Sequence, residues 1–348
     1  MADSRTNSIG PADKAKIALL ALMALAVPLY IFYGLTRNWM DELFAGARAQ
    51  LFGQVLVAIL LESLPFVVAG SIVSGLLEAL VPADRIARLV PKHRALRLLA
   101  AGGMGVVLPL CNCGIVPVAR RLVRKGLPLE MAVVYMLAGP LVSPIVIAST
   151  AVAFSGQGLS LWMPLARVFC GLAVAVAVGL MAARWGETDP LRPTPHDSHN
   201  ERERLPAAQV LPHVLNCMVQ DFVLLGGYLM LGALVAATFQ AFVPRNVLVS
   251  IGQLPVLGTL AMMVMAFAMN LCSEADAFVA ATFGQFSLAG RLAFLVLGPM
   301  LSFRMVAAYA GTFRRRMLLV LIVAAPLTLA VCELAGWLLT LLGGPAAR

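Results

Sequence analysis

Apolar and polar residues follow one another along the chain in long blocks, rather than with the short period of a soluble helix or strand. A membrane-spanning helix needs about 20 consecutive apolar residues. Stretches of this kind lie at 17–35, 51–80, 98–118, 130–154, 159–183, 214–243, 255–283, 289–310 and 317–342. Composition agrees, because 61% of the 348 residues are hydrophobic and 12% are charged, whereas about a quarter of a soluble domain is charged. The pattern therefore predicts an all-α polytopic membrane protein.

Lys and Arg residues indicate which stretches cross the membrane, because positive charges collect on the cytoplasmic side. If all nine stretches cross and the N-terminus is cytoplasmic, twelve Lys and Arg residues lie on each side. If 98–118 and 255–283 instead enter and leave on one side, nineteen lie in the cytoplasm and five outside. We therefore expect seven full transmembrane helices and two re-entrant helical hairpins, with a cytoplasmic N-terminus and a periplasmic C-terminus. Nine full spans are the alternative.

The two halves of the chain match each other at a constant offset of 159 residues. The matched pairs are Glu62 with Asp221, Cys113 with Cys272, Ser143 with Ser302, and Gly139-Pro140 with Gly298-Pro299. A match of several unusual residues without gaps indicates a duplication. Together with the charge distribution it predicts an inverted repeat, the plan of secondary transporters whose two halves form a site near the membrane midplane.

The repeat and the composition divide the chain into four parts. These are an N-terminal segment with one transmembrane helix (1–50), a first repeat (51–185), a linker (186–212) and a second repeat (213–348). The linker is rich in proline and charge and has no apolar period, which is typical of a mobile loop. We expect the linker to be cytoplasmic and flexible.

Proline and glycine interrupt several apolar stretches and are expected to break helices there. The expected break residues are Pro109, Gly114, Pro117, Gly139, Pro140, Gly298 and Pro299. Non-helical backbone at membrane depth is tolerated only inside protein or beside a cavity. The interruptions in the two predicted hairpins therefore predict a buried site near the centre of the membrane.

Both interruptions carry cysteine and asparagine, and we expect the hairpin tips to meet around a solute. The expected solute-binding residues are Cys111, Asn112, Cys113, Asn270 and Cys272. Thiol ligands select soft ions such as Cu(I), Zn(II), Cd(II) and trivalent arsenic. The three cysteines would thus be the ligands if the solute is a metal or a metalloid. Free cysteine is also common as a small buried apolar residue, which is our interpretation of Cys170, Cys217 and Cys332.

Carboxylates inside apolar stretches are costly to bury and are therefore expected to be functional. Those that we expect to carry protons or cations are Glu62, Asp221, Glu274 and Asp276. The alternative for these residues is structural pairing with a helix N-terminus or with an arginine inside a span. Arg167 and Arg304 are placed in this way, and we expect them to be such structural partners.

Charge and motif content argue against several other classes of protein. The formal net charge of +9 is explained by basic clusters at the cytoplasmic ends of spans, so nucleic acid is not expected as a partner. The sequence lacks a phosphate-binding Gly-Lys-Ser/Thr loop and a zinc-protease HExxH motif, so neither an enzyme nor a bound cofactor is expected. Two alternatives to transport stay open, namely a membrane thiol–disulfide oxidoreductase that uses the Cys-x-Cys pair and a non-transporting subunit of a membrane complex.

The segment LPLCNCGIVPVARRLVRKGLPLEMAVVYMLAGPLVSPIVI resembles the predicted-permease family that includes the methylarsenite efflux permeases. NLCSEADAFVAATF and GPMLSF resemble the second-half signature of the same family, and the resemblance covers about 50–342. By this resemblance Cys111 and Cys113 match the family's paired cysteines and Cys272 matches its later one. The resemblance implies a bacterial inner-membrane permease that exports a soft, thiol-reactive solute, such as a trivalent organoarsenical or a heavy-metal ion. Its partners would be the lipid bilayer, the solute and, in a homo-oligomer, further copies of the chain.

Overall fold

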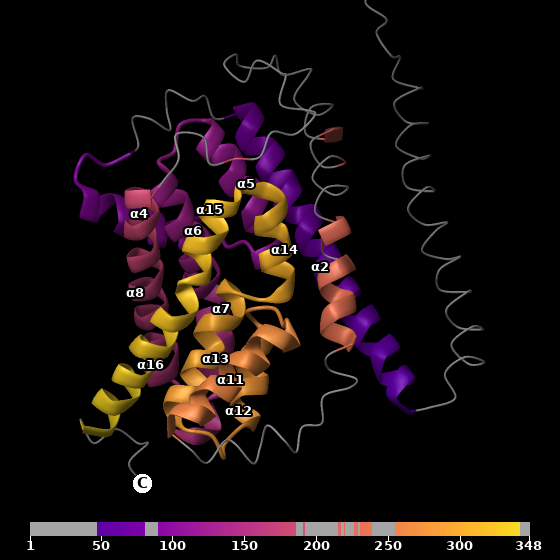
Figure 1. The fold of residues 1–348 in the computed structure, drawn as a ribbon, viewed down its shortest axis with the longest axis vertical. Helices are drawn as coiled ribbons and strands as arrows, with labels where there is room; N and C mark the ends of the chain where they lie inside the picture. The colour runs from indigo at the N-terminus through magenta and orange to yellow at the C-terminus, as the bar shows by residue number, and fades with distance from the viewer. Residues whose placement is uncertain are drawn as a thin grey trace, which may run out of the picture. The chain divides into compact units, whose positions relative to one another are not determined.

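The computed structural model describes residues 47–80, 90–185 and 255–341, together with residue 191 and parts of 215–238. The predicted first span at 17–35, most of the linker and Asp221 lie outside these described residues. Residues 55–348 form one compact unit and residues 1–54 another. The arrangement of helices in the first of these units, drawn in Figure 1, positions the candidate site.

The described part of the chain is helical apart from its connections and an isolated bridge between Leu191 and Phe313. The helices of the first half are α2 (Ala47–Leu80), α4 (Arg94–Val107), α5 (Asn112–Arg124), α6 (Leu129–Val142), α7 (Pro144–Ala153), the short 3-10 helix η1 (Ser155–Gln157) and α8 (Trp162–Trp185). Those of the second half are α11 (Pro255–Met269), α12 (Ala275–Thr282), α13 (Leu288–Met300), α14 (Phe303–Thr312), α15 (Arg315–Ile322) and α16 (Ala324–Leu341). The expected all-α class is confirmed.

Several described helices are long and apolar enough to cross a membrane. Four candidate spans lie at 50–77, 162–184, 288–312 and 317–338. A fifth is formed by α6 and α7 if this pair, which is bent by 41°, is taken as one span. The predicted number of seven full spans plus two hairpins includes segments outside the described residues, and it stays a prediction.

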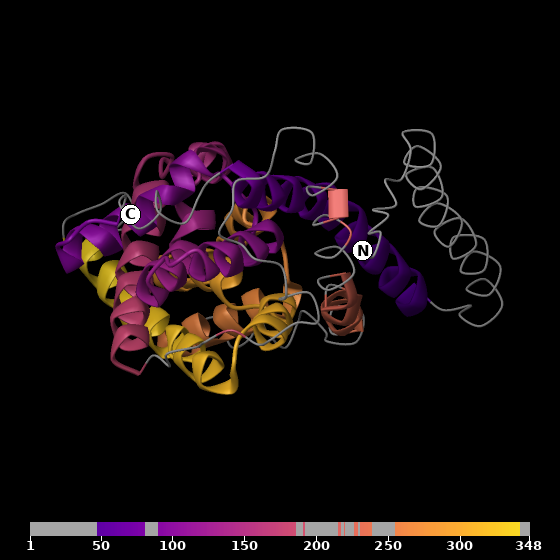
Figure 2. The ribbon, with the colours of Figure 1, turned by 90° about the horizontal axis from the view of Figure 1, so that it is seen from above.

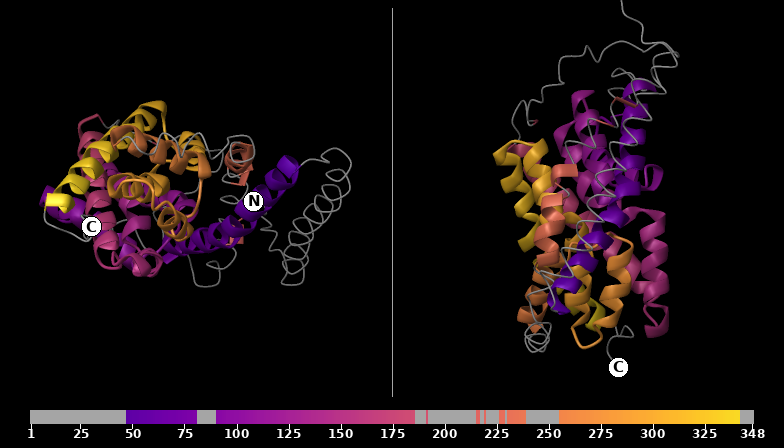
Figure 3. Two further views of the ribbon diagram at one scale, coloured as in Figure 1. Left: turned by 90° about the horizontal axis from the view of Figure 1, so that it is seen from below. Right: turned by 90° about the vertical axis from the view of Figure 1, so that its right-hand side faces the viewer.

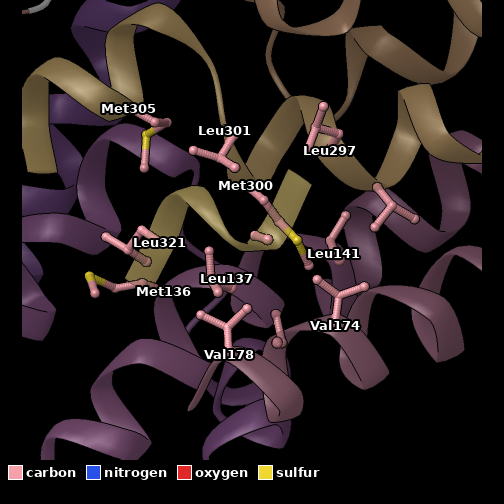
Figure 4. Packing of buried hydrophobic residues seen from close by; sticks show 14 of the residues in the cluster. Met136, Leu137, Leu141, Val174, Val178, Leu297, Met300, Leu301, Met305 and Leu321 are labelled. Atoms are coloured by element: carbon pink, nitrogen blue, oxygen red, sulfur yellow. The ribbon is translucent and has the colours of Figure 1, made fainter. Parts of the chain in front are cut away.

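Helices α6 and α13 form the centre of the unit. Both are buried along almost their whole length, which explains why their sequences are apolar on every face. Helix α6 packs against α4 and α8, whereas α13 packs against α11 and α16, and the two central helices also contact each other. Figure 4 shows this packing around Leu137, Val178 and Met300, and Figure 2 shows the elements of 90–185 beside those of 255–341.

Helices α4 and α5 form a hairpin whose two ends lie at the beginning of α6. Arg94 Nε and Arg97 Nη1, at the start of α4, lie 3.3 and 3.2 Å from the carboxylate of Glu130 at the start of α6. Lys125, which follows α5, donates from Nζ to the carbonyl of Leu77 near the end of α2 at 3.1 Å. The hairpin therefore begins and ends at one end of the unit, which we call the Glu130 end.

Helices α11 and α12 form a second hairpin at the other end of the central helices. Gln157, after α7, donates from Nε2 to the carbonyl of Ala281 at the end of α12 at 2.8 Å. Its Oε1 accepts from Arg291 Nη1, near the start of α13, at 2.6 Å. Since α6 and α7 lead from the Glu130 end to Gln157, the two hairpins enter from opposite ends. Figures 1 and 3 show α4 and α5 far from α11 and α12 along the vertical axis.

The helix breaks do not all lie where proline and glycine predict them. Pro109 lies between α4 and α5, but Gly114 and Pro117 lie inside α5. Gly139 and Pro140 lie inside α6, and Gly298 and Pro299 lie inside α13. The chain breaks instead at Ser143 and at 301–302, two or three residues later. A proline removes one hydrogen bond and kinks a helix, but tight packing on all sides allows the helix to continue for part of a turn.

One residue of the linker is held against the second half. Leu191 is buried and forms the isolated antiparallel bridge with Phe313, directly after α14. The other residues of 186–212 lie outside the described part of the chain, so the predicted flexible linker stays a prediction. The bridge places Leu191 beside the end of α14.

Candidate functional site

The break between α11 and α12 carries a buried asparagine whose side chain has no partner. Asn270 ends α11 with a φ of +52°, a left-handed conformation that asparagine tolerates better than most residues. The residue is 2% exposed, and neither Nδ2 nor Oδ1 has a hydrogen-bond partner within the described structure. A buried polar group without a partner costs free energy, so this amide is a candidate for contact with a solute.

Two residues later in the same break, a cysteine contacts a carboxylate from α2. Cys272 is buried, and its Sγ donates to Oε1 of Glu62 at 2.6 Å. Glu62 is followed by Pro65 inside α2, and a proline has no N–H to donate to the carbonyl of Leu61. The structure thus brings together one expected solute-binding residue and one expected coupling residue from elements 210 positions apart.

The same break is held in place by a buried ion pair. Arg167 on α8 donates from Nη2 to both carboxylate oxygens of Asp276, at 3.0 and 2.8 Å, and to the carbonyl of Ser273 at 3.1 Å. Its Nη1 donates to Thr150 Oγ1 on α7 at 2.8 Å. Arg167 and Asp276 are 1% and 2% exposed. A bidentate pair of this kind orients both partners, so Arg167 fixes the second break against the first half.

Glu274 is a further carboxylate of the same turn. Glu274 precedes α12 and is partly exposed within the unit, and one of its oxygens accepts from Ser273 Oγ at 3.4 Å. Asp276, in contrast, is committed to Arg167. Of the four expected coupling carboxylates, Glu62 contacts a thiol, Asp276 an arginine and Glu274 a serine, while Asp221 lies outside the described residues.

The break between α4 and α5 has a comparable set of groups. Leu110 N donates to the carbonyl of Leu108 at 2.8 Å, which closes a tight turn after α4. Cys111 is buried directly before α5, and its carbonyl accepts from Gly114 N at 3.1 Å. Asn112 is 2% exposed, and its Oδ1 has no hydrogen-bond partner within the described structure. The side chain of Cys113 lies outside the described residues.

Helix α2 contacts both breaks. A Cβ atom on Gly70 would overlap the backbone of Gly114 in α5, so the two helices touch at these glycines. Glu62, eight residues earlier in α2, contacts Cys272. A helix rises 1.5 Å per residue, which places the two contacts about 12 Å apart along α2. Among the described side chains, no group of three or more His, Cys, Asp and Glu residues is arranged to hold a metal ion.

Two residues of this region were not expected from the sequence to take part. Thr150 and Ser63 are ordinary polar residues inside apolar stretches, and nothing in their surroundings in the sequence distinguishes them. Arg304 donates from Nη1 to Ser63 Oγ at 2.7 Å, although we expected it to pair with a carboxylate. The signal for Arg167 was its charge in the middle of an apolar stretch, but the sequence did not indicate that Asp276 is its partner.

A largely apolar helical fold, with polar side chains buried at helix breaks, defines a multi-pass membrane protein and is typical of transport proteins. Comparison with known proteins gives the same class. The sequence profile of the ArsP_1 family, described as predicted permeases, matches residues 49–338. The chain belongs to this family.

Two bacterial proteins illustrate the relationship. The chain is 36% identical to "UPF0718 protein YcgR" of Bacillus subtilis (strain 168) over 269 residues, which cover 77% of this chain and 90% of that protein. It is 32% identical over 267 residues to the "Putative two-component membrane permease complex subunit" of Streptococcus mutans serotype c, covering 76% of this chain and 88% of that protein. No solved structure matches the chain.

Proposed function

We propose that this protein is a secondary transporter that exports a soft, thiol-reactive solute across the bacterial inner membrane. The observation that carries the proposal is the contact between Cys272 and Glu62 at a helix break, beside the unpartnered amide of Asn270. A buried thiol, a partly buried carboxylate and a buried amide without a partner among the described residues are costly between apolar helices unless a solute uses them. Trivalent organoarsenicals and heavy-metal ions bind thiolates and are the solutes that we propose.

In this proposal the solute binds to cysteines of both breaks. Cys272 comes from the second break and Cys111 and Cys113 from the first, with Asn112 and Asn270 beside them. We propose that the two breaks approach each other when all three thiols bind one solute. Movement of one half against the other, as in alternating access, supplies such an approach.

The helix boundaries support an internal repeat. Helix α7 covers Pro144–Ala153 and α14 covers Phe303–Thr312, the same interval moved by 159 residues. Helices α6 and α13 also begin 159 residues apart. The contacts between halves correspond as well, because α5 packs against α14 and α12 packs against α7. We infer that the two halves are inverted repeats related by a pseudo-two-fold axis.

The two hairpins support the re-entrant topology. Each begins and ends at one end of the unit, and the two hairpins lie at opposite ends. The Glu130 end carries the cluster of Arg and Lys around α4 and α5, so the positive-inside rule makes it cytoplasmic. In our proposal the N-terminus is then cytoplasmic, the C-terminus is periplasmic, and the outer faces of the long helices contact lipid.

Transport against a gradient needs an energy source, and the sequence has no ATP-hydrolysing motif. We propose that protons drive export through the carboxylates Glu62, Asp221, Glu274 and Asp276. Glu62 is the strongest of the four, since it contacts the thiol that binds the solute. Asp276 is held by Arg167 and contributes by positioning the break.

The test is protection of a sensitive bacterial host against trivalent methylarsenic and against cadmium, zinc and copper. The full chain should protect against at least one of these agents, whereas Cys272→Ser and Glu62→Gln should lose most of the protection at equal protein level. Cys170→Ser is the matched control, because Cys170 is a buried cysteine inside α8 and belongs to neither break. Full protection by the triple variant Cys111→Ser, Cys113→Ser, Cys272→Ser would exclude the thiol role.

A second candidate function is that of a subunit in a permease complex. The printed name of the Streptococcus mutans relative gives it as a subunit of a two-component complex. In that case transport would require a second protein supplied by the same bacterium. Expression of this chain alone in a foreign host would then give no protection, and co-expression with the genes that neighbour it in its own genome would restore protection.

A further inference from the structure

Two of the buried arginines, Arg167 and Arg304, differ in their partners. Arg167 is 1% exposed and is neutralised by the bidentate contact with Asp276. Arg304 is 4% exposed, but among the described residues it donates only to the hydroxyl of Ser63, and its Nε has no partner. A neutral hydroxyl oxygen does not compensate the charge of a guanidinium group, so Arg304 has no counter-ion among the residues that the structure describes.

The position of Arg304 is fixed by several elements. It lies in the first turn of α14, and its Nη1 reaches Ser63 on α2. A Cβ atom on Gly232 would lie 2.7 Å from the Cα of Arg304, so a helix of the second half passes directly against this turn. The preceding residue Phe303 packs on Phe267 of α11 with ring centroids 4.4 Å apart. These contacts fix the backbone of Arg304, and the hydrogen bond to Ser63 orients its guanidinium, which is buried.

Among the described residues, no carboxylate forms an ion pair with the guanidinium of Arg304. Glu62 is adjacent to Ser63 in the chain, but its described hydrogen bond is with Cys272. Arg291, another buried arginine, donates to Oε1 of Gln157, and its Cζ lies over the ring of Phe154, 5.8 Å from the ring centroid. A buried cation without a counter-ion is strongly unfavourable, which points to an anion as the partner of Arg304.

We propose that Arg304 and Ser63 bind a small inorganic monoanion between α2 and α14. The guanidinium supplies one positive charge and planar N–H donors, and the Ser63 hydroxyl can turn its own hydrogen toward the same anion. A single charge is neutralised by a monoanion, and chloride and nitrate are the ions that we propose. The proposal does not depend on the identity of the exported solute.

The test is the thermal unfolding of the purified full-length protein in detergent at constant ionic strength. Chloride, nitrate or thiocyanate replaces gluconate, an anion too large for the site. We expect the unfolding temperature of the wild type to rise and saturate with at least one of the small anions. Arg304→Gln should abolish the saturable rise, and Ser63→Ala should raise the half-saturating concentration about tenfold, the effect of losing one hydrogen bond to a charged group.

Control variants separate a specific site from a general effect of charge. Arg291→Gln removes a buried arginine elsewhere and should respond to anions as the wild type does. Arg304→Lys keeps the charge but loses the planar donors, so it should respond only at higher anion concentration. A response of this kind would show that the variant is folded and that the positive charge itself contributes to binding. In gluconate, Arg304→Gln should unfold at or above the wild-type temperature, because it removes an uncompensated charge.

Three outcomes would overturn the anion site. The first is a wild type that shows no saturable response to any of the three anions. The second is an equal loss of response in Arg304→Gln and Arg291→Gln. The third concerns Asp221, which lies outside the described residues: if only the Asp221→Asn variant responds to anions, then an internal carboxylate is the partner of Arg304. Failure to transport any solute would leave the anion site intact.

Discussion

At the scale of single residues, charge inside an apolar stretch drew attention to Glu62, Asp276 and Arg167 but did not indicate their contacts. Glu62, Asp276 and Arg167 stand out in the sequence for this reason. Their pairing does not, because a residue 159 positions after Arg167 is Pro326, so the repeat offers no second example of the contact. The bond between Arg167 and Asp276 depends on how α8 and the second break pack together, and packing between distant segments is not encoded in local pattern.

The ion pair between Arg167 and Asp276 leads to a test of stability. Removing one partner leaves a buried charge alone and costs about 3–5 kcal/mol. We therefore expect Arg167→Met and Asp276→Leu each to lower the free energy of unfolding strongly, measured by denaturant titration in micelles. The double variant removes both charges and should be more stable than either single variant. Additive losses in this double-mutant cycle would contradict a direct interaction.

At the scale of helices, the existence of the elements could be predicted and their ends could not. Long apolar stretches predicted α2 and α8 within a few residues of their observed bounds. Stretch 130–154, however, is divided at Ser143 into α6 and α7. Pro140 and Pro144 were visible in the sequence, but a proline can lie inside a helix, at its start or in a kink. Tertiary packing decides among these, so the exact break could not be read from the sequence.

The crossing of α2 and α5 at Gly70 and Gly114 gives a prediction at this scale. Gly70→Val places side-chain atoms where the backbone of Gly114 lies, so α2 must move away from the first break. We expect a loss of stability of about 1–3 kcal/mol together with a loss of protection in the resistance assay. Gly103→Ala is the control, because open space surrounds Gly103 in α4.

Alanine has a higher helix propensity than glycine, so the Gly103→Ala protein should be as stable as the wild type or more stable. Wild-type protection and wild-type unfolding in Gly70→Val would show that α2 and α5 do not touch at this point. A variant that keeps its stability but loses protection would instead locate the effect at the first break itself.

At the scale of the whole molecule, the distribution of Lys and Arg predicted two re-entrant hairpins. The contacts of the described residues are consistent with this prediction. The charge pattern carries this information because insertion into a membrane depends on it directly. The distance between the two breaks cannot be predicted in this way, because neither composition nor spacing carries information about it. That the hairpin tips meet at one solute stays a prediction.

Reporter fusions test the topology of the first hairpin. Fusions after His93 and after Lys125 should report the same, cytoplasmic side, because Arg94 and Lys125 both lie at the Glu130 end. A fusion after Ser155, which follows α7, should report the opposite side. Opposite signals at His93 and Lys125 would mean that 94–124 crosses the membrane completely, as in the alternative of nine full spans.

The contacts of α2 have a mechanical consequence for any cycle of transport. Helix α2 contacts the first hairpin where Gly70 crosses Gly114, and it contacts the second hairpin through the hydrogen bond from Cys272 to Glu62. Two glycines in contact have no side chains to interlock, so the helices can slide past each other there. The hydrogen bond at Cys272, in contrast, is lost when its sulfur binds another atom. Binding of a solute to Cys272 would therefore release α2 from the second hairpin while its contact with the first hairpin remains. Helix α2 would then rotate about its contact at Gly70.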